Sequence, residues 1–121
     1  MKKNLVVVLV LVATATSVFA IDTNKYEVFS KMNNTSTFNG LVSYLGADYY
    51  QAKQLELVFS MTEKKMKSAL KVDNEAAAEK AMYFNLGNVK FVLSEEQYKK
   101  YLVFINVSVY NKNTDTYIAG L

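Results

Sequence analysis

The sequence predicts an all-α protein: a small bundle, or a curved antiparallel arrangement, of three to four helices that follows a cleaved signal peptide. Two observations predict this fold. Apolar residues recur at spacings of three and four along most of the chain, and capping residues stand at the start of these stretches. We divide the chain into a signal peptide (1–20), a polar N-terminal segment (21–37), a helical domain (38–112) and a C-terminal tail (113–121).

The first twenty residues have the three parts of a secretory signal peptide. Lys2 and Lys3 precede an apolar run over 5–15, and the small residues Val18 and Ala20 fit a cleavage site. The apolar run is too short to span a bilayer core of about 30 Å. We therefore expect cleavage after residue 20 and export to the periplasm or the cell exterior.

Charge and cysteine content restrict the partners and the compartment. The chain has 14 basic residues, all lysine, and 11 acidic ones, so loss of Lys2 and Lys3 leaves a nearly neutral mature chain. Without arginine and without a strong positive charge, nucleic acid is not an expected partner. There is no cysteine, which excludes disulfides and a lipid anchor. We expect a soluble exported protein, not a lipoprotein, with no transmembrane segment after signal cleavage.

The first two helices of the domain begin at capping residues. The polar cluster at 33–37 can cap a short helix that ends near Gly46. Asp48 then stands three residues before Gln51, a capping-box spacing, and one helix is predicted over 49–71. A restart of this helix near Ser60 is the alternative.

The third helix is predicted to begin after Asp73 or Asn74, because the strong helix former alanine follows at 76–78. Gly87 is expected to weaken or end it. Its predicted inner face comprises Ala78, Ala81, Met82, Asn85, Leu86 and Val89. We interpret Asn85 on this face as a buried amide that satisfies a neighbouring backbone group, with a ligand contact as the alternative.

The last helix has the clearest start signal. Ser94 and Gln97 have capping-box spacing, and Glu95 and Glu96 suit the positive end of a helix. The alternating pattern over 105–110 is typical of a strand, but the strong cap upstream favours helix.

The residue inventory offers little for catalysis. Histidine and cysteine are absent, and the four glycines are too dispersed for a phosphate-binding loop. A Ser60–Lys64 nucleophile pair is outweighed by the simpler interpretation of a polar residue beside a solvated lysine. We assign no catalytic residue, metal site or cofactor and expect a protein that is not an enzyme.

Two surface features are candidates for binding. Lys64, Lys67 and Lys71 form a basic stripe on one helix face, for which a solvated face is the alternative. Four tyrosines in the first turns of two helices are the second candidate, with partial burial as the alternative. They are Tyr49, Tyr50, Tyr98 and Tyr101.

The segment Leu93-Ser94-Glu95-Glu96-Gln97 resembles the L-T-x-x-Q motif of the small all-helical periplasmic proteins of the Spy and CpxP type. Met61-Thr62-Glu63-Lys64-Lys65 is similar to a second, degraded copy at a helix start, and Gln97–Leu102 is similar to the last helix of small secreted proteins of Bacteroides-like bacteria. The resemblance implies a curved helical molecule that holds unfolded clients or senses envelope stress. Its motif residues are caps, so it implies no active site.

These observations lead to two hypotheses of function. The first is an exported, non-enzymatic helical binding protein, chaperone-like or related to envelope stress, with a protein partner or unfolded client. The alternative is a structural or assembly component of the cell envelope or surface. The oligomeric state stays open, with a homodimer among the options.

Overall fold

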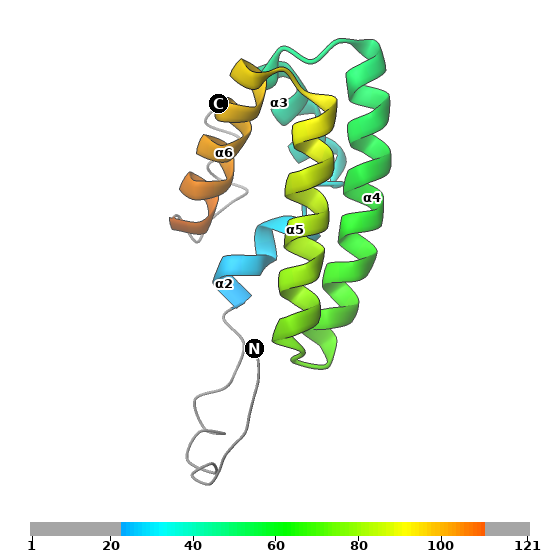
Figure 1. Cartoon of the computed structure of the whole chain (residues 1–121), viewed down its shortest axis with the longest axis vertical. Coiled ribbons are helices and arrows are strands. Elements are labelled where there is room, and N and C mark those ends of the chain that lie inside the picture. Colours follow the sequence, from blue (N-terminus) through cyan, green and yellow to red (C-terminus); the bar gives the residue numbers. More distant parts are fainter. Residues whose placement is uncertain (1–22, 111–121) are drawn as a thin grey trace, which may run out of the picture.

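The computed structural model describes residues 23–110 and confirms the all-α prediction (Figure 1). All regular structure in this part of the chain is helical. The predicted signal peptide, its cleavage site and the tail over 113–121 lie outside the described residues. The elements are α2 (Thr23–Tyr26), the 3-10 turn η1 (Glu27–Ser30), α3 (Thr35–Leu45), α4 (Tyr49–Lys71), α5 (Glu75–Val92) and α6 (Glu95–Tyr110).

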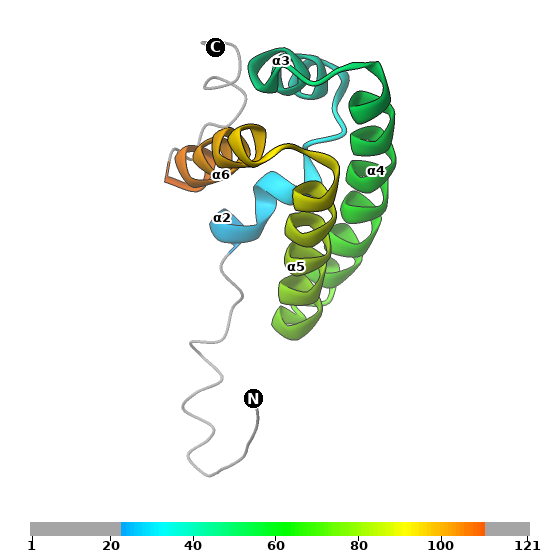
Figure 2. The same ribbon diagram turned by 45° about the horizontal axis from the view of Figure 1, so that its top comes forward.

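The two longest helices, α4 and α5, form an antiparallel hairpin that makes up one side of the molecule (Figure 1). Helices α3 and α6 pack against each other at the open-end half of this hairpin, with α6 alongside it (Figure 1). The short elements α2 and η1 lie in the space between α6 and the hairpin (Figure 2). A small bundle results, in which η1 contacts both α4 and α6.

The predicted caps are confirmed where the structure describes them. The Asn34 side chain accepts hydrogen bonds from two backbone amides of α3, and Gly46 ends that helix in the left-handed region at φ 68°. Asp48 and Gln51 form a complete capping box at the start of α4. Asn74, not Asp73, caps α5, because its side chain accepts from the Ala77 amide.

The structure answers three questions about where helices continue or end. Helix α5 continues through Gly87 to Val92, so this glycine does not end it. Residues 105–110 are helical, as favoured over a strand. Helix α4 is unbroken from Tyr49 to Lys71, as predicted, so the alternative of a restart near Ser60 does not occur and Met61–Lys65 lie in the middle of this helix. Thr62 instead donates its hydroxyl to the Val58 carbonyl one turn earlier, at 2.8 Å.

The N-terminal segment over 21–37, which we placed outside the helical domain, is part of the core as far as it is described. Tyr26, Val28, Phe29 and Met32 are all buried. The segment looks polar in sequence because its apolar residues are few, yet these few point inward from α2 and η1. The described part of this segment therefore packs into the same core as the helical domain.

Asn85 lies at the centre of a buried polar cluster, and its partners are side chains rather than the expected backbone group. Its oxygen accepts a hydrogen bond from the Tyr101 hydroxyl. Its amide nitrogen donates to the Thr62 hydroxyl at 3.1 Å and to the Met32 sulfur at 3.8 Å. The cluster joins α4, α5, α6 and the segment after η1, so it fixes the relative register of four parts of the chain.

Candidate interaction surface

Two of the four candidate tyrosines are exposed and two are covered, which agrees with the alternative of partial burial. Tyr49 and Tyr50 are 69% and 78% exposed and pack edge to face. Tyr98 is half-buried, and Tyr101 is completely buried. The ring of Tyr101 stacks on Phe59, and burial raises the pKa of its hydroxyl well above 10.0. The inclusion of Tyr101 in a binding surface is therefore wrong, because this side chain belongs to the core.

The predicted caps of α4 and α6 join to each other, which the sequence did not reveal. Ser94 and Gln97 form the expected capping box, with Gln97 also accepting from the Ser94 amide at 2.9 Å. The side-chain amides of Gln51 and Gln97 then bond to one another at 2.8 and 3.2 Å. Gln97 also donates to the Gly46 carbonyl. Asp48, Ser94 and Gln97 thus have a structural role at the end of the bundle.

The predicted basic stripe is exposed along α4. Lys64, Lys67 and Lys71 all lie on the surface. Lys67 forms an ion pair with Glu63 at 2.8 Å, one turn away on the same helix. Exposed pairs of this kind contribute little to stability, so the stripe is compatible with a solvated face.

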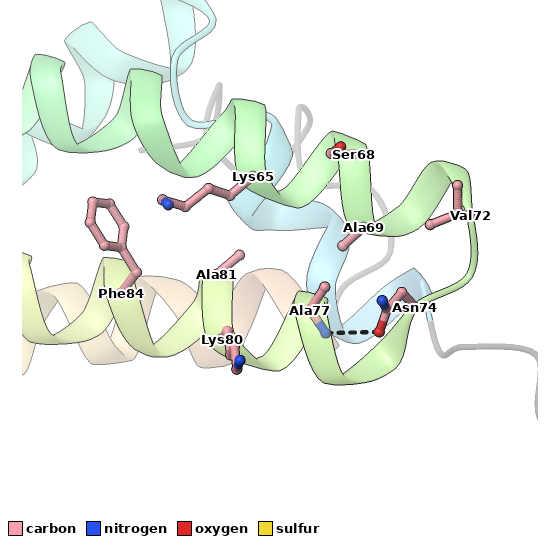
Figure 3. A pocket seen from close by; sticks show the side chains of 9 residues that line it. All are labelled: Lys65, Ser68, Ala69, Val72, Asn74, Ala77, Lys80, Ala81 and Phe84. Atoms are coloured by element: carbon pink, nitrogen blue, oxygen red, sulfur yellow. Dashed lines mark hydrogen bonds between the residues drawn. The ribbon is translucent and has the colours of Figure 1, made fainter.

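A groove between α4 and α5 lies beside this stripe, close to the loop that joins the two helices (Figure 3). It has a volume of about 380 Å³. We call it the hairpin groove. The residues that line it are Lys65, Ser68, Ala69 and Val72 with Asn74, Ala77, Lys80, Ala81 and Phe84.

Small side chains between large ones shape the hairpin groove. Ala69, Ala77 and Ala81 lie between the two helices and leave room there, while Val72 stands at the loop end (Figure 3). Near the other end, Lys65 extends from α4 toward Phe84 of α5, with its ammonium 5.0 Å from the ring centre. The groove therefore combines an apolar floor with cationic groups at its edge.

Large apolar side chains continue this face beyond the groove. Leu57 and Met61 precede Lys65 by two turns and one turn on α4, so helical spacing places all three on one face. Leu57 is 64% exposed and Met61 41%. We call Leu57, Met61 and Phe91 the apolar rim.

Phe91 belongs to the rim because of the register of the hairpin. The hydrogen bond between Thr62 and Asn85 sets that register. Phe91 follows Asn85 by six residues and Leu57 precedes Thr62 by five, so the two lie at similar heights along antiparallel helices. Phe91 is 89% exposed. An exposed phenylalanine beside an apolar groove is typical of a binding surface.

A second, more apolar groove lies between η1, α5 and α6, but it is a weaker candidate. Its lining includes Lys25 and Val109, which lie close to the two ends of the described part of the chain. The chain continues beyond both, so exposure there does not show a free surface. The hairpin groove is far from these ends in sequence and is the better candidate.

The sequence contains a signal for the hairpin groove in the two phenylalanines of α5. Phe84 and Phe91 are absent from the predicted inner face of α5, although both are large and apolar. Residues of that kind on the outer face of a helix call for a second apolar contact. Ala77, predicted only as a helix former, also lines the groove.

Among residues 23–110, no group of acidic side chains is placed to hold a metal ion. No helix within that part of the chain has the length and apolar character needed to cross a membrane. Comparison with protein-family models, curated proteins and solved structures found no match to this chain.

Proposed function

We propose that this protein is an exported, non-enzymatic helical binding protein that holds a protein partner or unfolded client on the outer side of the α4–α5 hairpin. The observation that carries the proposal is the apolar rim beside the hairpin groove, above all Phe91 at 89% exposure. Aromatic side chains of this kind contribute most of the binding energy when they become buried at an interface. The predicted signal peptide supports export.

The rest of the molecule supports the same proposal. The inner side of the hairpin is covered by η1 and by the buried cluster around Asn85, so its core residues are not open to a partner. The outer side is held rigid by two long helices. A partner would therefore meet a preformed surface, which reduces the entropy cost of binding.

The test is suppression of aggregation. A chemically unfolded client protein is diluted from denaturant with an equimolar amount of this protein, and light scattering is followed over time. The proposal expects clear suppression by the wild type. A Leu57→Ser/Phe91→Ser variant is expected to lose at least about half of it, because two exposed apolar contacts are removed.

A matched control separates the surface from general hydrophobicity. Val103 is a half-exposed apolar residue on α6, away from the hairpin groove, and Val103→Ser should retain full suppression. Circular dichroism verifies that all variants are folded. Absence of suppression by the wild type, or equal loss in the control, would contradict the proposal.

A further inference from the structure

The charged side chains that line the hairpin groove are all positive. Lys65 and Lys80 line the groove, and Lys64 and Lys71 lie exposed beside it on α4. None of the acidic residues described in the hairpin is among the residues that line the groove. Glu63 accepts a hydrogen bond from the Asn33 amide at 3.5 Å and pairs with Lys67 at 2.8 Å. Glu75 and Glu79 are exposed in the first turns of α5. Asp73 lies in the loop at one end of the face, and Glu56, which pairs with Lys53 at 3.9 Å, precedes Leu57 at the other end.

From this one-sided charge we infer that the hairpin groove binds an acidic, apolar segment of a partner protein. Carboxylates of the segment would lie beside Lys65 and Lys80, and an apolar side chain would lie on the alanine floor. The inference rests on the proposed function and adds the chemical class of the partner. Complementary charge of this kind raises the association rate and selects among partners.

The dimensions fit a short peptide segment. From Leu57 to Val72 the face extends over fifteen residues of helix, about 22 Å. An extended chain of about seven residues covers that length. The volume of about 380 Å³ lies within the range of about 300–1,000 Å³ that ligand sites occupy.

Other occupants fit less well. In a two-fold dimer the same face meets itself, which would bring Lys65 and Lys80 of one copy against those of the other. The like charges oppose such a contact. A membrane surface would meet the exposed rim but not the recessed alanine floor, whereas a single protruding side chain reaches it.

The test compares three labelled peptides of about ten residues by fluorescence anisotropy. In each peptide every second residue is leucine or phenylalanine. The residues between them are all Glu in the first peptide, all Gln in the second and all Lys in the third. The Glu peptide is expected to bind about tenfold more tightly than the Gln peptide, the size that two or three surface ion pairs give, and the Lys peptide most weakly. Raising the salt from about 0.05 M to about 0.5 M should remove most of this difference.

Variants of the protein locate the effect. Lys65→Gln/Lys80→Gln should lower affinity for the Glu peptide about five- to tenfold and leave the Gln peptide unchanged. Lys99→Gln/Lys100→Gln makes the same change of charge on α6, away from the hairpin groove, and is expected to have less than about a twofold effect.

The outcomes separate this inference from the proposed function. Equal binding of the three peptides, or no effect of Lys65→Gln/Lys80→Gln, would overturn the inference while suppression of aggregation could persist. A dimer that dissociates in Phe91→Ser, seen by light scattering, would assign the groove to a second copy and overturn it. Lysine-dependent binding to anionic lipid vesicles in preference to the Glu peptide would also overturn it. Loss of both peptide binding and suppression would remove the proposed function as well.

Discussion

The buried cluster around Asn85 allows a sharp test of what holds the bundle together. Tyr101→Phe removes one hydroxyl and leaves the ring in place between Phe59 and Phe104. The Asn85 oxygen, at 0% exposure, then loses its donor. Leaving a buried acceptor without a partner costs about 1–3 kcal/mol, so we expect a loss of about 2 kcal/mol in the free energy of unfolding.

The assay is urea unfolding followed by circular dichroism, with the free energy obtained by linear extrapolation. A loss of about 2 kcal/mol corresponds to a fall in Tm of roughly 8–16 °C for a domain of this size. Tyr98→Phe is the matched control on the same helix, because Tyr98 is only half-buried. It should change stability by less than about 0.5 kcal/mol.

A double-mutant cycle decides whether the cluster acts as a unit. Asn85→Leu alone leaves the Tyr101 hydroxyl with only the Met32 sulfur as partner. The double variant Asn85→Leu/Tyr101→Phe removes both polar groups, and its cost should be clearly less than the sum of the two single costs. Additive costs, or a Tyr101→Phe variant as stable as Tyr98→Phe, would refute this account of the cluster.

Three further predictions follow from the same structure. Gly46→Ala should cost about 1–2 kcal/mol in urea unfolding, because φ is 68° there, whereas Gly87→Ala, inside α5 with open space around it, should add about 0.5–1 kcal/mol. Folding raises the pKa of Tyr101, so the neutral hydroxyl stabilises the folded state fully below pH 10, and this stabilisation is lost as the pH rises further. At high pH the free energy of unfolding should therefore fall by up to about 1.4 kcal/mol per pH unit, and Tyr101→Phe should remove this dependence. Ala77→Leu, which fills the hairpin groove, should weaken binding of the Glu peptide about tenfold, while Ala76→Leu on the exposed face of α5 should not.

The helix boundaries were the part of the fold that the sequence could predict. Their signals are local: Asp48 and Gln51 bond within one turn, as do Ser94 and Gln97. A cap is decided by residues three positions apart, so no knowledge of the tertiary structure is needed.

The predictions about which side chains are buried were less successful, because burial depends on contacts between residues that are distant in sequence. Tyr101 contacts Asn85, sixteen residues away, and Met32, sixty-nine residues away. Tyr49 is the same residue type and also lies in the first half of a helix, but it is 69% exposed. Only the packing of η1 against α4 and α6 decides which of the two is buried.

The hairpin groove also depends on packing, but its origin can be traced to particular residues. The core side of α5 uses Ala78 and Ala81, and these small side chains let α4 and α5 approach closely. On the outer side the adjacent Ala77 leaves a recess, because the larger Val72 and Phe84 stand at its ends. Alanine favours the helix, brings the two helices together and leaves the outer recess at the same time. The alanines that follow Asn74 therefore link the stability of the hairpin to the surface that we propose for binding.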